Sequence, residues 1–322
     1  MFLELIIFII SLLVLVKSGG VVVKHLVRIA RFLKWSEFIV SFLIMAVVTS
    51  LPELFVGITS AIHKRPELSF GNVIGSNIIN LTLIVAIPVL VVGALTLKSK
   101  MAQRTGLYTA AIAVLPVLLV IDGMLSRIDG IMLLICLVLY FNWILRKKEQ
   151  FKKAFNNTNI KEDPNEIPIG TKTFLKDSVF FLIGMAFLLL AGEGIVYSAV
   201  SLAGSLGVPL VIISIILVAL GTNLPELIFS IKAVKLKHKD MVLGNLMGSV
   251  IVNSTLVLGL TVLIHPLKIV NYSPYIAGII FTLITIFLFV LFVRTHEQIN
   301  RKEALFLLLV YFLFVIIQFI VK

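Results

Sequence analysis

The sequence has few charged residues. Only 14% of its 322 residues are Asp, Glu, Lys or Arg, whereas soluble domains average about 25%. Hydrophobic residues make up 60% of the chain, and the mean hydropathy is +1.13. Because this composition leaves too little polar surface for a water-soluble fold, the sequence predicts an integral, multi-pass protein of the cell membrane.

Cysteine and the residue patterns of common enzymes are also scarce. Cys136 is the single cysteine, so it can form no internal disulfide, and it carries no information on the redox compartment. The apolar segments contain no HExxH motif, no Ser/His pair and no aspartate dyad. The sequence therefore argues against a membrane enzyme.

Acidic residues are outnumbered by basic ones, 16 against 28, which gives a formal net charge of +12. The basic residues fall in short runs between apolar segments, and this favours loops that face anionic lipid over nucleic-acid binding.

The N-terminus, MFLELIIFII, lacks a basic region before its apolar run and contains Glu4. We therefore expect a retained first span rather than a cleaved signal peptide.

Apolar segments long enough to cross a bilayer as helices recur along the whole chain. The sequence predicts ten of them, at residues 2–22, 37–60, 72–96, 105–121, 128–145, 178–199, 208–231, 241–264, 274–293 and 303–321. We expect an all-α membrane protein with a five-helix repeat over residues 1–145, a linker over 146–177 and a second five-helix repeat over 178–322.

Two motifs occur twice at one constant separation. Residues 49–54 read TSLPEL and residues 222–227 read TNLPEL, while 71–76 read GNVIGS and 244–249 read GNLMGS. Thr49 precedes Thr222 by the same interval as Gly71 precedes Gly244, so the chain is an internal duplication. The duplicated motif regions are residues 46–80 and 219–253.

The duplication is predicted to be inverted. Five spans in a repeat is an odd number, so the second repeat must enter the membrane from the opposite side. The loops after the odd-numbered spans hold 23 Lys and Arg residues when Lys17 is counted with the first loop, and the loops after the even-numbered spans hold 4. By the positive-inside rule, the linker 146–177 is cytoplasmic and both termini are outside.

Each motif places a glutamate inside an apolar segment, where an ionisable side chain is costly and usually functional. On each of these helices an alanine, a threonine and the glutamate share one face, because they are separated by three and four residues. These residues are Ala46, Thr49 and Glu53 in the second span and Ala219, Thr222 and Glu226 in the seventh.

A proline precedes each glutamate. Pro52 cannot donate the backbone hydrogen bond that the Val48 carbonyl would accept, and Pro225 has the same effect on Gly221. Bent helices of this kind are tolerated at membrane depth where they line a cavity. Each half therefore offers carboxylate, hydroxyl and carbonyl oxygens within about two helical turns, and such oxygens are the ligands of a hard cation.

The third and eighth spans add hydroxyls and amides. The matched residues are Ser76 and Asn80, and Ser249 and Asn253, with Asn77 as a further amide in the first repeat. The GxxxG spacings in both motifs let another helix approach closely. We expect this approach to bring the amides of the third span to the glutamate of the second, with calcium as the cation, because zinc and copper would favour His and Cys.

Taken singly, these features have structural interpretations: a proline kinks a helix, GxxxG packs helices, and a lone glutamate can be hydrogen bonded. Their matched recurrence favours a site.

Glu193 has no acidic counterpart, so we favour a packing or interfacial role for it over a cation or proton relay. Asp122 and Asp129 are expected to cap helices. The histidines near span ends are expected at the surface: His63, His238, His265 and His296.

At these residues the chain resembles prokaryotic members of the sodium/calcium exchanger branch of the calcium/cation antiporter superfamily, whose repeats carry G-T-S-x-P-E and then G-N-x-x-G-S. The likeness covers essentially the whole chain. It implies electrogenic, alternating-access antiport of calcium against sodium, with calcium efflux and with no cofactor or obligatory protein partner. The implied ligands are Glu53 and Glu226 for both ions, Thr49 and Thr222 for calcium, and Ala46, Ser76, Ala219 and Ser249 near flanking sodium positions.

The chain departs from the family pattern in three ways. Val48 replaces a glycine, Asn223 replaces the serine that Ser50 retains in the first copy, and Asn80 and Asn253 are both amides where some relatives have an aspartate. With fewer acids, the stoichiometry and the coupling ion stay open. A proton/calcium exchanger is the alternative, although the G-N-x-x-E context typical of that type is missing. A cation channel is less favoured, because broken helices in an inverted repeat suit an occluded site.

Overall fold

The computed structural model describes residues 2–33, 45–96, 100–147, 171–235, 239–295 and 298–320, and most of these residues are helical. Within these ranges nine segments are long and apolar enough to cross a membrane, and Leu51–Ile62 is a shorter apolar helix. The α-helices are α1 (Phe2–Phe32), α2 (Met45–Thr49), α3 (Leu51–Ile62), α4 (Pro66–Leu81), α5 (Leu83–Val92), α6 (Lys100–Leu119), α7 (Arg127–Arg146), α9 (Thr171–Leu206), α10 (Leu210–Ile213), α11 (Ala219–Thr222), α12 (Leu224–Lys235), α13 (Lys239–Val252), α14 (Leu258–Ile264), α15 (Ser273–Thr295) and α16 (Arg301–Ile320).

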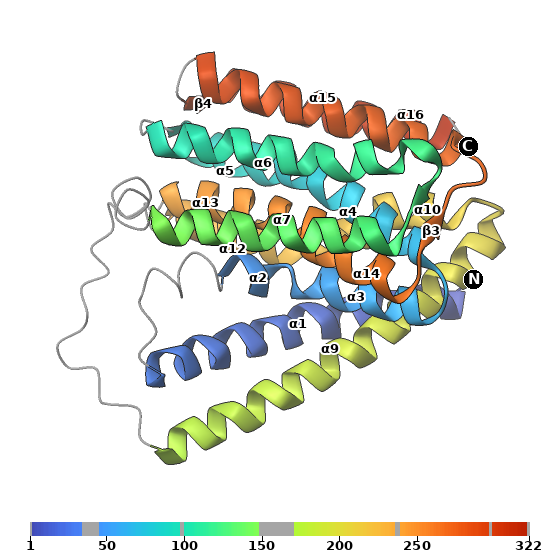
Figure 1. Cartoon of the computed structure of the whole chain (residues 1–322), viewed down its shortest axis with the longest axis horizontal. Helices are drawn as coiled ribbons and strands as arrows, with labels where there is room; N and C mark the ends of the chain where they lie inside the picture. Colours follow the sequence, from blue (N-terminus) through green and yellow to red (C-terminus); the bar gives the residue numbers. More distant parts are fainter. Residues whose placement is uncertain are drawn as a thin grey trace.

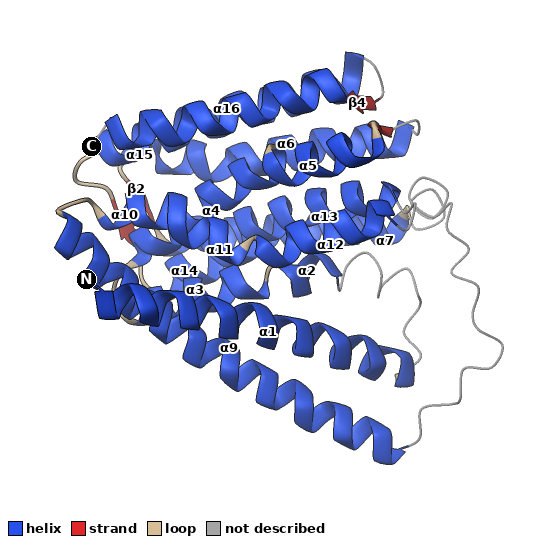
Figure 2. Ribbon diagram, turned by 180° about the vertical axis from the view of Figure 1, so that it is seen from behind, coloured by secondary structure: helices blue, strands red, loops and turns tan. Residues whose placement is uncertain are grey.

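The helices form one bundle in which the helices of the motif regions lie in the middle. Figures 1 and 2 show α1 and α9 side by side along one flank, and α15 and α16 along the opposite flank. The two ends of the chain lie at the same end of the bundle in both views. This is the arrangement that an even number of membrane crossings requires.

The central helices are covered by protein, and the outer ones are not. In the segment Pro66–Val92, which includes α4 and α5, 89% of the most apolar window is buried, and in Val242–Ile264 the share is 78%. The corresponding share is 28% for α7 and 33% for α16. Because a helix that is buried on every side can carry polar groups only if they are satisfied, the polar residues of the central helices need partners inside the bundle.

Two short antiparallel ribbons join the repeats, one at each end of the bundle (Figure 1). In one ribbon β1 (Ala94–Thr96) pairs with β4 (Gln298–Asn300), and in the other β2 (Met124–Leu125) pairs with β3 (Leu267–Lys268). Each ribbon takes one strand from each repeat, and Ala94 and Leu267 are separated by the same interval as the duplicated motifs. Equivalent strands thus lie at opposite ends, as the predicted inverted duplication requires.

The second and seventh spans are broken at equivalent residues. A turn at Ser50 separates α2 from α3, and a turn at Asn223 separates α11 from α12. Pro52 and Pro225 occupy the second position of the helices that follow, where a backbone N–H would have no acceptor within its own helix. The predicted helix breaks are confirmed. Two π-helical turns, η3 (Ser214–Val218) and η4 (Asn253–Val257), add irregular backbone in the second repeat.

Several predicted span boundaries are wrong. The third span is predicted at residues 72–96, but its helices run from Pro66 to Val92 and residues 94–96 form β1. The sixth is predicted at 178–199, whereas α9 has 36 residues and begins at Thr171, inside the predicted linker. Polar residues at both ends of α9 mask its length, because hydropathy marks only the part of a helix that lies in hydrocarbon. Residues 37–44 and 148–170 lie outside the described ranges.

Candidate cation-binding site

Glu53 and Glu226 lie in the first turns of α3 and α12, at the two helix breaks. They are 0% and 1% exposed, and their carboxylates are close enough for the two charges to interact. Both oxygens of Glu53 and Oε2 of Glu226 lack a hydrogen-bond donor. A buried carboxylate without a partner is strongly unfavourable, so this pair is suited to a bound cation.

The threonines of the motifs bond to the opposite repeat. The hydroxyl of Thr49 in α2 donates to Oδ1 of Asn245 at 3.2 Å and lies 3.1 Å from Oγ of Ser249, both in α13. The hydroxyl of Thr222 in α11 donates to Oδ1 of Asn72 in α4 at 3.2 Å. The threonine of the second span therefore contacts the eighth span, and the threonine of the seventh contacts the third.

The glycines of the GxxxG spacings explain this crossed arrangement. A Cβ atom on Gly248 would lie 2.5 Å from Cβ of Ala46, and one on Gly75 would lie 2.6 Å from Cβ of Ala219. Both distances are far below van der Waals contact, so only glycine permits these approaches. The predicted close approach of helices is confirmed, but it occurs between repeats.

The amide side chains contribute further oxygens. Asn77 donates to Oγ of Ser254 at 2.8 Å, and Asn80 donates to Oδ1 of Asn223 at 3.1 Å. The Oδ1 atoms of Asn77, Asn80 and Asn253 are buried and have no donor. Within the described ranges no three His, Cys, Asp or Glu residues cluster. The two carboxylates are thus accompanied by neutral oxygens, a ligand set that suits a hard cation.

The remaining predicted residues lie at the helix breaks or beside them. The carbonyl of Ala46 accepts the Thr49 hydroxyl at 3.5 Å, and the carbonyl of Ala219 accepts the Thr222 hydroxyl at 3.3 Å. The hydroxyl of Ser50 is buried and has no hydrogen-bond partner. The structure therefore brings the predicted residues of both repeats to the contact between them.

Asn72 and Asn245 are not among the predicted site residues, although both belong to the G-N-x-x-G-S motifs. They are equivalent residues of the duplication, and each lies four residues before a predicted serine, so it shares a helical face with that serine. Both amide nitrogens are buried without an acceptor. Periodicity within the motif was the signal that could have found them.

A cavity of about 460 Å³ leads to the site from beside α1. Its lining includes Gly19 and Lys24 of α1, Thr49 and Pro52 from the second span, and Pro225 of α12. The cavity thus reaches a predicted ligand and the prolines of both motifs from the half of α1 nearer its C-terminal end. It ends one residue short of Glu53 and Glu226, which follow these prolines and do not line it.

The cavity beside α1 has no counterpart where α9 meets α3, because these two helices are in close contact. A Cβ on Gly192 of α9 would lie 2.7 Å from Oγ1 of Thr59 and 3.2 Å from the carbonyl oxygen of Phe55. The equivalent residue of α1 is Gly19, whose added Cβ would find its nearest atom, Cγ of Pro52, at 3.8 Å. The two equivalent helices therefore pack differently: α9 is closed against α3, while α1 borders the cavity.

Glu193 follows Gly192 and pairs with His63, which lies just beyond the end of α3. Oε2 of Glu193 is 2.6 Å from Nε2 of His63, and both side chains are about half exposed. The pair borders a second cavity of about 360 Å³ that Arg65 also lines. This contact between α9 and the α3–α4 turn fits the predicted interfacial role of Glu193 and the predicted surface position of His63.

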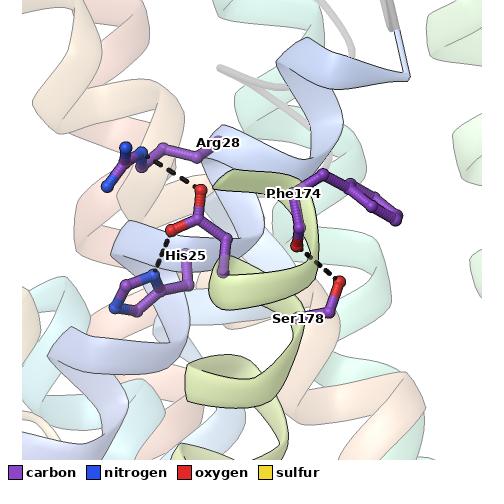
Figure 3. A network of polar contacts seen from close by, with 5 residues as sticks. His25, Arg28, Phe174 and Ser178 are labelled. Atoms are coloured by element: carbon purple, nitrogen blue, oxygen red, sulfur yellow. Dashed lines mark hydrogen bonds and ion pairs between the residues drawn. The ribbon is translucent and has the colours of Figure 1, made fainter. Parts of the chain in front are cut away.

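A buried acidic residue that the sequence did not single out joins α1 to α9. Asp177 in α9 is 1% exposed; Oδ1 lies 2.7 Å from Nδ1 of His25, and Oδ2 lies 3.2 Å from Nε of Arg28. In Figure 3 dashed lines join His25 and Arg28 of α1 to this carboxylate of α9. The ring of His25 also stacks on Phe180 of α9. Because Asp177 falls within the predicted linker, its partners could not be predicted.

The other singled-out polar residues have local roles. Asp129 forms a capping box with Ser126 at the start of α7, and Asp122 accepts the N–H of Met124 at 3.0 Å. The prediction for Asp129 is confirmed, whereas Asp122 stabilises a turn. His265 is partly buried after α14. His238 and His296 lie outside the described ranges.

Comparison with known proteins gives one consistent result. The sequence matches the family described as sodium/calcium exchanger protein over residues 3–146 and 177–320. It is 28% identical over 97% of both chains to the sodium/calcium exchanger MaX1 of Methanosarcina acetivorans, and 30% identical to the inner membrane protein YrbG of Escherichia coli, covering 80% of this chain and 79% of YrbG.

The fold is similar to solved structures of the sodium-calcium exchanger NCX_Mj. One structure, soaked with Na⁺ and Sr²⁺, has a TM-score of 0.64 and 29% identity over 97% of both chains. Another, soaked with Na⁺ and Ca²⁺, has a TM-score of 0.64 and 28% identity over the same coverage. This is a family of membrane transporters and not of enzymes. By sequence, fold and the duplicated motifs, the chain belongs to the sodium/calcium exchanger family of cation antiporters.

Proposed function

We propose that this antiporter exchanges calcium for sodium, and that both ions use the site around Glu53 and Glu226. The observation that carries the proposal is the pair of buried carboxylates, three of whose four oxygens have no hydrogen-bond donor. Two glutamates balance one calcium ion or two sodium ions, so the same pair can hold either. The surrounding hydroxyl, amide and carbonyl oxygens are ligands that calcium accepts.

The proposed ligand set consists of the two central glutamates and of neighbouring residues from both repeats. Glu53 and Glu226 are central, and the other ligands are drawn from residues of both repeats: Thr49, Thr222, Asn77, Asn80, Asn253, Ser76, Ser249, Ser50 and Asn223, with the carbonyls of Ala46 and Ala219. Asn72 and Asn245 orient the two threonines by accepting their hydroxyl hydrogens. The name of the Methanosarcina relative and the ions soaked into NCX_Mj support calcium and sodium as the substrates.

The proposal includes an orientation and a mechanism. The distribution of Lys and Arg favours a cytoplasmic linker and external termini, so the cavity beside Gly19 and Lys24 lies on the cytoplasmic side. The contact of α9 with α3 then lies on the external side. Transport requires this asymmetry to reverse, and the contacts of Asp177 with His25 and Arg28 favour movement of α1 and α9 together. An inward sodium gradient would then drive calcium out of the cell.

Uptake of radioactive calcium into sodium-loaded proteoliposomes tests the site. Glu53→Gln and Glu226→Gln should each abolish sodium-dependent uptake, because the substitution removes one of two buried negative charges. Glu303→Gln is the matched control, since Glu303 accepts the backbone N–H of Asn300 at the start of α16. Uptake by both site variants at the wild-type rate would refute the assignment of the carboxylates.

The same vesicles separate the proposed coupling from its alternatives. Replacing the sodium gradient with a pH gradient should abolish concentrative calcium uptake, whereas a proton/calcium exchanger would retain it. A channel would pass calcium without any countertransported ion. Uptake driven by protons but not by sodium would overturn the sodium assignment. The role of the carboxylates would then be tested separately, by proton-driven uptake in the Glu53→Gln and Glu226→Gln proteins.

A further inference from the structure

Two groups of oxygen atoms flank the carboxylate pair, and the inverted duplication relates them. The Asn223 flank consists of Ser76, Ala219 and Asn223, and the Ser50 flank consists of Ser249, Ala46 and Ser50. Each residue of one flank is the duplicated equivalent of a residue in the other. The flanks are chemically identical except that an amide in the first replaces a hydroxyl in the second, so any difference between them begins at this residue.

In the Asn223 flank the amide nitrogen is surrounded by the oxygens. Nδ2 of Asn223 donates to Oγ of Ser76 at 2.6 Å and to the carbonyl oxygen of Ala219 at 2.8 Å. Oδ1 of Asn223 accepts from Asn80 at 3.1 Å, and this contact together with the Ala219 bond fixes the amide orientation. Asn223 is 2% exposed and Ser76 is fully buried. The amide hydrogens therefore point at the two oxygens that a small cation would need.

In the Ser50 flank, the hydroxyl of Ser50 takes the place of the Asn223 amide. Oγ of Ser50 is buried and has no hydrogen-bond partner. Oγ of Ser249 and the carbonyl of Ala46 contact the Thr49 hydroxyl at 3.1 and 3.5 Å. Oδ1 of Asn253, the counterpart of the Asn80 amide oxygen, also lacks a donor. Oγ of Ser50 and Oδ1 of Asn253 therefore remain available to a cation.

We propose that the side-chain amide of Asn223 occupies the cation position of its flank, so that this antiporter binds one sodium ion fewer than two equivalent flanks would hold. An amide NH₂ is a donor that cannot coordinate a cation, and it competes with sodium for the lone pairs of Ser76 and Ala219. A sodium ion entering this flank would have to break both hydrogen bonds inside a buried site, where an unpaired donor is costly.

The inference rests on the proposed exchange of sodium for calcium and narrows its ligand set, because Asn223, Ser76 and the Ala219 carbonyl are then not sodium ligands. Because the amide occupies the Asn223 flank, sodium ions can bind only at the Ser50 flank and at the two carboxylates. Two sodium ions and one calcium ion each match the charge of Glu53 and Glu226. We therefore expect exchange that carries no net charge, in contrast to the electrogenic exchange that the family resemblance implies.

Asn223→Ser tests the inference, because it gives the Asn223 flank the residue that the Ser50 flank already has. Calcium uptake into proteoliposomes is measured against sodium concentration, with the membrane potential set by potassium and valinomycin. The Hill coefficient for sodium should rise by up to about one, since the number of sites sets its maximum, and uptake should become dependent on the potential. A sodium Hill coefficient and a potential response equal to those of the wild type would overturn the inference.

Equilibrium binding of radioactive sodium to the purified protein gives a readout that does not require transport. Asn223→Ser and Asn223→Thr should each bind one more sodium ion per chain than the wild type, and Ser178→Ala, which removes a hydroxyl bonded within α9, should bind the same number. Extra sodium in both variants without sodium-driven calcium uptake in the wild type would support the role of Asn223 and refute the exchange. Equal sodium binding in all proteins would refute the role of Asn223 whatever the transport result.

Discussion

Each threonine of the duplicated motif donates its hydroxyl to an asparagine of the other repeat, Thr49 to Asn245 and Thr222 to Asn72. Helical periodicity within the motifs predicted which residues share a face, because that depends only on spacing along the chain. It could not predict which helix that face meets, because packing of GxxxG surfaces depends on the approach of segments far apart in sequence. The sequence therefore predicted most members of the candidate site but not their partners.

The hydroxyl of Thr222 offers a test at the scale of one residue. Thr222→Val keeps the shape of the side chain but removes the donor to Asn72 and the bond to the Ala219 carbonyl. Calcium affinity, measured by equilibrium binding, should fall about fivefold, since a lost hydrogen bond is worth about 1 kcal/mol. Thr282→Val in α15 removes a hydroxyl that bonds only along its own helix, to Gly278, and should leave calcium affinity unchanged. Equal effects of the two substitutions would remove Thr222 from the site.

At the scale of helices, α1 and α9 are equivalent in the duplication but differ in their surroundings. Their termini could not be predicted, since α9 extends for 36 residues and its polar ends look like linker. The buried contacts of Asp177 with His25 and Arg28 depend on that extension. The helix breaks at Ser50 and Asn223 were predictable, because a proline two residues on fixes where the next helix begins.

The difference in packing between α9 and α1 predicts unequal effects of equivalent glycine substitutions. Gly192→Ala would place a methyl group against Thr59 and the backbone of Phe55, whereas Gly19→Ala would meet nothing closer than 3.8 Å. Overpacking of this kind costs about 1–3 kcal/mol, so Gly192→Ala should lower the thermal stability and slow calcium uptake more than Gly19→Ala. Thermal unfolding and uptake by the two purified variants test this. A larger effect of Gly19→Ala would contradict the assigned packing.

For the whole molecule, charge counting and the odd number of spans were sufficient to predict an inverted duplication. The two ribbons that join the repeats, β1 with β4 and β2 with β3, were not predictable, because strands of two or three residues carry no recognisable alternation. They place equivalent segments at opposite ends of the bundle and so hold the repeats in their inverted relation. The crossed packing at the centre follows from that relation, and it assembles one site from two copies of the same motif.

The most direct test of the account follows both ions in the same vesicles. Proteoliposomes loaded with radioactive sodium are placed in a calcium-containing medium, and calcium uptake and sodium release are recorded together. We predict that sodium leaves as calcium enters, in a fixed ratio, and that both fluxes are lost in Glu53→Gln and Glu226→Gln proteins. Calcium uptake that proceeds without sodium release, or both fluxes surviving in the two variants, would contradict exchange at this site.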